Sequence, residues 1–249
     1  MIPKIIHFCW LSGDAYPPDI ERCILSWKKE LSEYKILLWD TKQFEINSIQ
    51  WVMEAFHEKK YAFAADYIRF YALYNYGGIY LDSDVEVIKS FNDLLNYKSF
   101  VGFEYSGLLE AAVIGAEKNC DWIKECLSWY NNRSFYDEKG KTREIVLPAI
   151  ISSIYEKSFK NKLLDNGIIK NFKENLLLPY KYFSPKNCYN NRIQEIENAY
   201  TIHHFKTTWL KNNIIVKTKK IIHLLLIKIF GKYFHDKILY RIRFNKLKN

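Results

Sequence analysis

The segment that most constrains the fold is a stretch of fifteen residues, Ala62–Tyr76, in which Asp66 and Arg69 are the only charged side chains. Because this stretch has no polar face, it predicts a helix that is buried nearly all round. Such a helix needs a large body of chain around it. The 249 residues, 49% of them hydrophobic, provide that body and exclude a disordered, collagen-like or coiled-coil architecture.

The residues after this helix combine a stop signal with an acidic pair. Gly77 and Gly78 allow a tight turn and a close approach of the backbone, and Ile79–Leu81 is expected to form a buried strand that leads directly into Asp82 and Asp84. Side chains two apart in an extended segment point the same way, so both carboxylates can reach one cation, or a cation and a ligand hydroxyl. Carboxylate oxygens suit Mg²⁺ or Mn²⁺, so the segment predicts a metal site.

The two charges of the buried helix, Asp66 and Arg69, are three residues apart and therefore share one face of the helix, where they can pair. Buried charges are costly unless they are paired or hydrogen-bonded. Two interpretations are open: a structural ion pair that fixes the register of the helix, or a pair that lines a polar ligand site. The acidic pair that follows favours the second.

The order of elements predicts an α/β fold. A strand at Lys4–Trp10, a helix at Asp19–Leu31 with Asp19 as its cap, and a strand at Tyr34–Trp39 form a βαβ unit, which implies a parallel sheet. Residues 158–198, rich in Asn and Lys, give no clear pattern. Further helices are predicted at Trp51–Lys60, Asp121–Tyr130 and Glu144–Tyr155, and further extended segments at Val85–Ile88, Ser99–Glu104, Ala111–Gly115 and Tyr200–Phe205.

The net charge of +9 is concentrated at the C-terminal end. Residues 211–249 contain eleven Lys or Arg and one acidic residue, whereas residues 1–210 carry 26 basic and 27 acidic residues. A neutral body is not expected to bind nucleic acid. The tail mixes lysines with bulky aliphatic residues, and two interpretations stay open: a basic amphipathic segment that lies on an anionic membrane surface, or helices that pack on the body.

Cysteine usage and hydropathy predict the compartment. The five cysteines show no metal-binding or disulfide spacing, which favours a reducing environment. The N-terminus lacks the apolar core of a signal peptide, and no apolar run approaches the roughly 18 residues of a membrane span. We therefore expect a cytoplasmic protein, associated peripherally with the inner face of the cell membrane if the tail is membrane-binding.

Two quoted segments carry a family resemblance. AFAADYIRFYALYNYGGIYLDSDVEV resembles the signature of DXD-type sugar transferases of glycosyltransferase family thirty-two, and IPKIIHFCWLSGDAYPPDIERCILSWKKELSEYKILLWD is similar to the opening of that family. Relatives include bacterial capsule and lipo-oligosaccharide transferases and yeast-type α-1,6-mannosyltransferases, with clostridial toxin glucosyltransferase domains as more distant kin. The resemblance implies a GT-A fold, a Rossmann-like and mostly parallel sheet flanked by helices, over residues 1–210. It also implies a nucleotide-sugar donor, a divalent cation and retention of anomeric configuration.

The resemblance assigns donor-binding roles residue by residue. Trp10 matches the aromatic residue that stacks on the donor base, although without the motif a core tryptophan would be the simpler interpretation. Asp66 and Arg69 match the pair that grips the hydroxyls of ribose and donor sugar. Tyr80 matches an aromatic residue that contacts the donor.

The acidic pair receives the metal-binding roles. Asp82 matches the carboxylate that reaches sugar or ribose hydroxyls and water on the metal, and Asp84 matches the direct ligand of Mn²⁺ or Mg²⁺. The motif offers no secure nucleophile for a double displacement, so front-face attack by the acceptor hydroxyl is preferred. Glu104 and Glu110 follow the donor half and are candidates for acceptor contact.

A second cluster, near the end of the main domain, is expected to close the metal site. His203 and His204 are followed by Thr208 and Trp209, where many relatives carry Ser-Trp and a preceding glycine. By strand alternation the two histidines face opposite ways, so at most one is expected to meet the metal. The alternative is one core histidine and one surface histidine.

Together with the residues, the resemblance implies a retaining, metal-dependent transferase that moves a hexose from UDP-hexose, or from GDP-mannose, to a glycan or lipid-linked oligosaccharide acceptor. Synthesis of capsular polysaccharide or lipopolysaccharide in a bacterium would be the setting. The main alternative is a metal-dependent hydrolase of nucleotide-sugars or phosphoesters, which would need a denser set of ligands for a second metal. A catalytically inactive sugar- or membrane-binding module is a further alternative, against which the intact acidic pair argues.

Overall fold

The computed structural model describes residues 1–160, 163, 167–193, 195–206 and 214–247. Its strands are β1 Ile5–Cys9, β2 Lys35–Trp39, β3 Gly78–Leu81, β4 Val85–Val87, β5 Ser99–Phe103, β6 Leu109–Ala116, β7 Lys170–Phe172, β8 Asn175–Leu178 and β9 Thr201–His203. Its α-helices are α1 Pro18–Glu30, α2 Gln50–His57, α3 Tyr61–Tyr76, α4 Asp121–Ser128, α5 Leu147–Phe159, α6 Ile214–Phe230 and α7 Lys232–Leu247.

Seven strands form the central sheet in the order β2-β1-β3-β6-β5-β8-β7. Strand β1 pairs in parallel with both β2 and β3, and β5 pairs in parallel with β8. Only β6 and β7 run against the other five strands of this sheet. The predicted βαβ unit and the mostly parallel sheet are thus confirmed.

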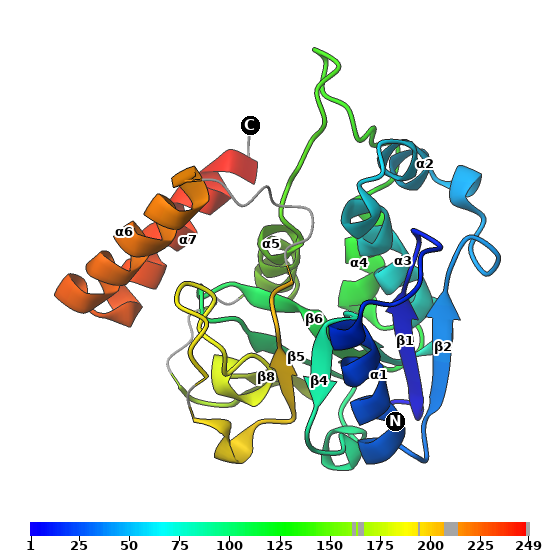
Figure 1. The fold of residues 1–249 in the computed structure, drawn as a ribbon, viewed down its shortest axis with the longest axis horizontal. Helices are drawn as coiled ribbons and strands as arrows, with labels where there is room; N and C mark the ends of the chain where they lie inside the picture. Colours follow the sequence, from blue (N-terminus) through cyan, green and yellow to red (C-terminus); the bar gives the residue numbers. More distant parts are fainter. Residues whose placement is uncertain (161–162, 164–166, 194, 207–213, 248–249) are drawn as a thin grey trace.

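Helices cover both faces of this sheet, with α1 on one face and α3, α4 and α5 on the other (Figure 1). Alternating side chains of the strands feed two separate cores. In β3, Ile79 and Leu81 join the core under α1, whereas Tyr80 between them joins the core under α3. A strand whose two faces are both covered has apolar residues throughout, without alternation of apolar and polar side chains, and β3 has this pattern.

The buried helix predicted from its apolar sequence is α3. Asp66 and Arg69 are only 8% and 4% exposed. The helix ends at two glycines with positive φ, 66° at Gly77 and 113° at Gly78. A Cβ atom on Gly78 would lie 2.6 Å from the carbonyl oxygen of Ile5, so any side chain there would push β3 away from β1.

Three details differ from the sequence-based expectations. Helix α1 begins at Pro18 with Pro17 as its cap, so Asp19 is in the first turn and is not the cap. Helix α5 begins at Leu147, because Pro148 suits the first turn, and not at Glu144. Strand β8 escaped prediction because its four residues, all buried, are too few to show a period within an Asn- and Lys-rich stretch.

A small second sheet brings distant parts of the chain together. Strand β4, directly after the acidic pair, runs antiparallel to β9 near the end of the body, with Val85 opposite His203. The backbone N–H of His204 donates to the carbonyl oxygen of Asp84 at 3.1 Å. The acidic segment and the histidine pair are therefore fixed side by side.

The basic tail forms a hairpin of α6 and α7, and α7 packs against α5 (Figure 1). His235 and Asp236 of α7 are buried, and Asp236 lies against Gly107 in the turn between β5 and β6. The Lys232 ammonium lies over the ring of Tyr105, 5.0 Å from its centroid. Within the parts of the chain described, no helix is long and apolar enough to cross a membrane. The predicted division at residue 210 falls in 207–213, outside the described residues, and stays a prediction.

Candidate active site

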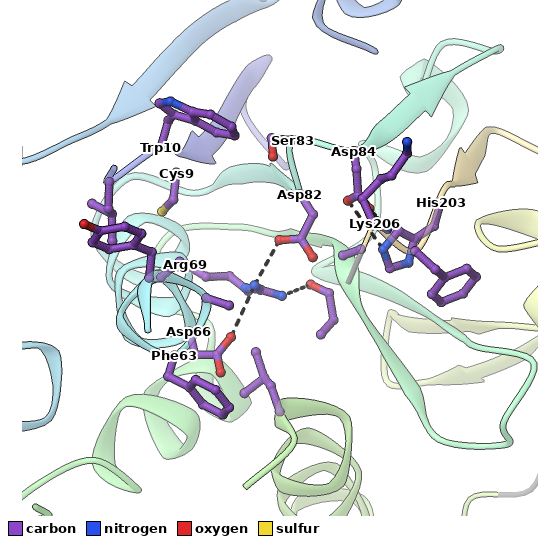
Figure 2. Close-up of a pocket in the computed structure, with 18 of the residues that line it drawn as sticks. Cys9, Trp10, Phe63, Asp66, Arg69, Asp82, Ser83, Asp84, His203 and Lys206 are labelled. Atoms are coloured by element: carbon purple, nitrogen blue, oxygen red, sulfur yellow. Dashed lines mark hydrogen bonds and ion pairs between the residues drawn. The ribbon is translucent and has the colours of Figure 1, made fainter. Parts of the chain in front are cut away.

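A cavity of about 1460 Å³ opens beyond the carboxyl ends of β1 and β3. Open α/β sheets bind ligands at this edge. Trp10 lies on one wall, Asp66 and Arg69 rise from α3, and Asp82 and Asp84 follow β3 (Figure 2). The six donor and metal candidates that the sequence places between residues 10 and 84 all line this single cavity: Trp10, Asp66, Arg69, Tyr80, Asp82 and Asp84.

Asp82, Asp84 and His203 form a cluster of potential metal ligands. Each offers one atom, and the three atoms lie within 4.8 Å of one another. Nε2 of His203 is 3.5 Å from Oδ1 of Asp84. Burial would raise the pKa of Asp84, but the neighbouring His203 and the backbone N–H of Lys206 hold that pKa at about 2. Burial likewise opposes a charge on His203, yet Asp84 and Glu110 raise its pKa well above the usual value.

Arg69 connects the acidic groups of the cavity floor. Its Nη2 lies 3.0 Å from Oδ1 of Asp82 and 3.4 Å from Oδ1 of Asp66, while Nη1 donates to the carbonyl oxygen of Ala111. The guanidinium also lies over the ring of Tyr80, 4.4 Å from its centroid. Burial raises the pKa of Asp66 to about 7, although Arg69 acts in the opposite direction. Arg69 is therefore both a structural ion-pair partner and a wall of the cavity.

The two candidate aromatic residues differ in exposure. Trp10 is half-buried on the cavity wall, where its Nε1–H donates to the carbonyl oxygen of Asp14 at 2.7 Å. Its ring meets Tyr16 edge-on, with centroids 5.0 Å apart, so the indole is held in place. Tyr80 is only 1% exposed, and its ring packs against the guanidinium of Arg69.

His203 and His204 face different partners. His203 turns toward Asp84, whereas Nε2 of His204 lies 2.9 Å from Oε2 of Glu86. Of the two histidines, only His203 belongs to the cluster with both aspartates. Thr208 and Trp209 lie outside the described residues, so their expected contact with the donor stays a prediction.

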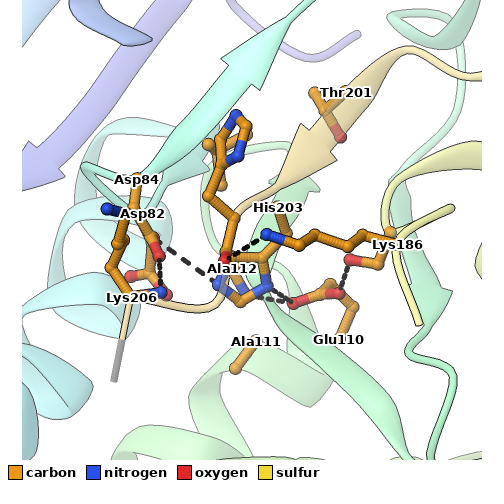
Figure 3. Close-up of polar contacts among 12 residues, drawn as sticks. Asp82, Asp84, Glu110, Ala111, Ala112, Lys186, Thr201, His203 and Lys206 are labelled. Carbon is orange, nitrogen blue, oxygen red and sulfur yellow. Dashed lines mark hydrogen bonds and ion pairs between the residues drawn. The ribbon is translucent and has the colours of Figure 1, made fainter. Parts of the chain in front are cut away.

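The two glutamates suggested for acceptor contact have separate environments. Glu110 is 1% exposed, and its carboxylate accepts from the backbone N–H of Ala112 and the hydroxyl of Ser184 (Figure 3). Glu104 also lines the cavity and accepts a hydrogen bond from Ser106. Acceptor contact stays a prediction for Glu104. The carboxylate of Glu110, by contrast, is hydrogen-bonded to protein groups and contacts Nδ1 of His203.

Lys206 was not predicted from the sequence. Its backbone N–H donates to Oδ2 of Asp84 at 2.7 Å, and its ammonium forms an ion pair with Asp19 at the rim of the cavity. The only sequence signal was a basic residue shortly after His203 and His204. Lys186, whose ammonium donates to the carbonyl oxygen of His204, was likewise not predicted.

Comparison with known proteins identifies this region. Residues 17–101 match the model of the glycosyltransferase sugar-binding region containing a DXD motif. This part of the chain is therefore similar to the DXD-containing, sugar-binding region of glycosyltransferases. Its acidic pair, Asp82 and Asp84, is the only D-x-D sequence in the matched segment.

Individual relatives support the same identification. Inositol phosphoceramide mannosyltransferase 3 of Schizosaccharomyces pombe is 31% identical over 107 residues, which cover 40% of this chain and 29% of that protein. An uncharacterized glycosyltransferase, L373, of Acanthamoeba polyphaga mimivirus is 27% identical over 205 residues, covering 77% of this chain and 76% of the relative. The chain spans a third or less of the length of the mannosyltransferases it matches in Schizosaccharomyces pombe.

The fold has a solved counterpart in the PaToxG glycosyltransferase. The two structures superpose with a TM-score of 0.50 and 20% sequence identity, over 64% of this chain and 70% of that one. At this identity the likeness concerns the fold, and the expected GT-A architecture is thereby confirmed.

Proposed function

We propose that this chain transfers a hexose from a nucleotide-sugar to an acceptor hydroxyl, with a divalent cation bound by Asp82, Asp84 and His203. One observation carries the proposal. The β4–β9 pairing adds an imidazole to the two carboxylates of the DXD motif, at the edge of a cavity that also contains Arg69. A ligand-sized cavity with converging polar groups is the expected form of a donor site.

The donor set fits Mn²⁺ or Mg²⁺. Two carboxylates provide hard oxygen atoms, and the imidazole nitrogen of His203 favours Mn²⁺ over Mg²⁺. Oδ2 of Asp84 accepts from the backbone N–H of Lys206, which fixes the carboxylate and leaves Oδ1 directed toward Nε2 of His203. When bound, the cation would supply positive charge beside the departing nucleoside diphosphate.

The surrounding residues suit the donor. The indole of Trp10 offers a rigid face to the base, and the ammonium of Lys206, paired with Asp19, lies at the rim. Nε of Arg69 is buried and has no hydrogen-bond partner among the described residues, so a donor remains for a sugar or ribose hydroxyl. Buried polar atoms are rarely left unpaired, which makes Arg69 the best-supported contact of the donor sugar.

We propose that the reaction retains the anomeric configuration by front-face attack. The bond from the anomeric carbon to the diphosphate oxygen breaks, a bond from that carbon to the acceptor oxygen forms on the same face, and the acceptor proton passes to the departing diphosphate oxygen. The carboxylates of the cavity floor are engaged: Asp66 and Asp82 with Arg69, Glu110 with His203. A carboxylate nucleophile for a double displacement would have to leave one of these pairs, which disfavours that route.

We propose UDP-hexose or GDP-mannose as the donor and a glycan or lipid-linked oligosaccharide as the acceptor. The names of the yeast relatives support mannose as the transferred sugar. The resemblance to family thirty-two, with its capsule and lipo-oligosaccharide transferases, supports a role in bacterial surface polysaccharide synthesis.

We also propose that the α6–α7 hairpin attaches the enzyme peripherally to an anionic membrane surface. Among the described residues, one side of α7 is buried by the body, but large apolar side chains of both helices stay exposed. Lysines are interspersed with them in the sequence, and each basic residue near an anionic leaflet contributes on the order of 1 kcal/mol. The exposed apolar residues form what we call the hairpin patch: Ile221, Ile222, Leu225, Ile229, Phe230, Tyr233, Phe234 and Ile238.

Release of nucleoside diphosphate from a panel of UDP- and GDP-sugars, with and without Mn²⁺ and glycan acceptors, tests the catalytic proposal. A transferase releases diphosphate in the presence of Mn²⁺ and much faster with the right acceptor. Equal release without acceptor would favour the hydrolase, and no release with any donor would favour the inactive binding module. The same panel identifies the donor.

A further inference from the structure

The side chain of Glu110 on β6 is buried directly behind His203. It is 1% exposed, yet it lines the same cavity floor as the metal-binding cluster. A buried carboxylate is strongly destabilising unless its oxygens are hydrogen-bonded. Three groups meet this requirement: the hydroxyl of Ser184 donates to Oε2, and the backbone N–H of Ala112 and Nδ1 of His203 contact Oε1 at 3.0 and 3.1 Å.

This arrangement determines which nitrogen of His203 faces the acidic pair. A carboxylate can only accept, so the imidazole must carry its proton on Nδ1 to bond Glu110. With Nδ1–H committed to Glu110, Nε2 is the nitrogen that faces the acidic pair, 3.5 Å from Oδ1 of Asp84, and a cation bound there would take the place of a second proton on Nε2 (Figure 3). The contact with Glu110 thus presents a ligand atom where a cation would sit.

We propose that Glu110 is a positioning residue for the metal site: it holds the His203 ring in the Nδ1–H tautomer and increases the basicity of Nε2. The inference rests on the proposed cation at Asp82, Asp84 and His203. Carboxylates behind metal-binding imidazoles act in this way, and their loss costs about 10–100-fold in metal affinity. The role differs from acceptor contact, because the carboxylate of Glu110 is occupied by protein donors.

The chain contains its own matched control. Glu86 forms the same type of pair with His204, the residue that follows His203. Oε2 of Glu86 and Nε2 of His204 are 2.9 Å apart. His204 does not belong to the cluster of potential metal ligands that the described residues form. The side chain of Glu86 is 30% exposed, and that of Glu110 is 1% exposed. Neutralising Glu86 therefore removes an equivalent Glu–His pair without touching the cation site.

The test measures Mn²⁺ binding to the full chain, by the electron paramagnetic resonance signal of free Mn²⁺, without nucleotide. Glu110→Gln is expected to raise the Kd for Mn²⁺ by about 10–100-fold, Glu86→Gln to leave it within about twofold, and Asp84→Asn to abolish binding. Equal Kd values for the Glu110→Gln variant and the wild type would overturn the inference. Equal losses in both glutamine variants would also overturn it.

Two further measurements keep the result interpretable. Thermal melting of each variant shows whether Glu110→Gln folds. If it does not, Glu110→Asp replaces it. This variant keeps the charge, but its side chain is too short to reach Nδ1 of His203, so it is also expected to weaken Mn²⁺ binding. Nitrogen-15 NMR of the histidines in the Mg²⁺-loaded protein reads the tautomer directly, and a proton on Nε2 of His203 would contradict the inference. If the wild type binds no Mn²⁺, the proposed metal site fails. If it binds and only Glu110→Gln has no effect, the positioning role alone fails.

Discussion

Arg69 joins helix α3 to the acidic motif, because its Nη2 lies 3.0 Å from Oδ1 of Asp82. The same atom is 3.4 Å from Oδ1 of Asp66, and all three side chains border the cavity. Arg69 therefore contributes to the fold as well as to the candidate ligand site.

The first prediction concerns folding. Arg69→Ala leaves the buried carboxyl of Asp66 and the partly exposed carboxylate of Asp82 without their partner, so we expect a loss of about 3 kcal/mol in the free energy of unfolding, measured by urea titration. Lys89→Ala is the control, since Lys89 pairs with Asp93 where both side chains are 53% exposed, and it should cost less than about 1 kcal/mol. Similar losses in the two variants would show that the buried pair has no special weight.

The second prediction concerns the metal. Asp84→Ala removes one of the two carboxylates of the proposed site, so Mn²⁺-dependent release of nucleoside diphosphate should fall by on the order of a hundredfold or more. Asp137→Ala, which changes a carboxylate that accepts backbone N–H groups in an exposed turn, should keep full activity. Near wild-type turnover of Asp84→Ala at saturating Mn²⁺ would remove Asp84 from the metal site.

The third prediction concerns nucleotide binding. Trp10 presents its indole to the cavity, and stacking of a base on an aromatic ring contributes about 1–3 kcal/mol. Trp10→Ala should weaken binding of free UDP or GDP by that amount in calorimetry, whereas Trp10→Phe should retain most of it. An unchanged dissociation constant in the alanine variant would make Trp10 a purely structural residue.

The fourth prediction concerns pH. His7 is fully buried: Nε1–H of Trp39 donates to its Nδ1 at 3.1 Å, and its Nε2–H donates to the carbonyl oxygen of Gly77 at 2.8 Å. Burial lowers the pKa of His7 from 6.5 to about 4, although the bond to Gly77 acts in the opposite direction. The unfolded chain therefore binds this proton more tightly than the folded one.

Stability from His7 is consequently complete above pH 6.5 and is lost as the pH falls toward 4, by on the order of 3 kcal/mol. Urea titrations at pH 7.5, 6, 5 and 4 measure this slope. His7→Gln keeps a polar side chain without a titrating ring, so its pH profile should be flatter in this window. An identical slope in both proteins would assign the acid lability to other groups.

The fifth prediction concerns the membrane. The full chain should co-sediment with vesicles that contain anionic lipid, and binding should weaken as salt rises. Replacing Ile222, Leu225 and Ile229 of the hairpin patch by serine should abolish binding without unfolding the protein, because these side chains are 49–67% exposed. Leu25→Ser is the control, since Leu25 is 61% exposed on α1. Equal binding of the triple variant would show that the patch is not the attachment site.

The sequence was enough to bring the proposed donor-binding residues together, because the determinants of their positions are local. Helix α3, the glycine turn and the acidic pair lie within 25 consecutive residues, so helical and extended periodicity suffices to place Asp66, Arg69 and Asp82 near one another. The βαβ unit at the N-terminus was predictable for the same reason.

Contacts between distant segments were harder to predict from the sequence. Which histidine meets the aspartates depends on the register of β4 against β9, which no local pattern encodes. The burial of Glu110 requires β6 to lie beside β3, and the ion pair of Lys206 with Asp19 requires α1 to approach the C-terminal loop. Strand β8, a short run in a polar stretch, becomes a strand only because β5 is there to pair with it.

The pairing of β4 with β9 also orders events during synthesis. Asp82 and Asp84 leave the ribosome well before His203, so a nascent chain holds two aspartates without their third partner until almost the whole body has emerged. A cation that needs all three ligands can bind only the folded body. By mass action it would then stabilise the folded state by about 2.7 kcal/mol when the free cation concentration is a hundred times the Kd. Assembly of the body and binding of the proposed cation would thereby be one linked equilibrium.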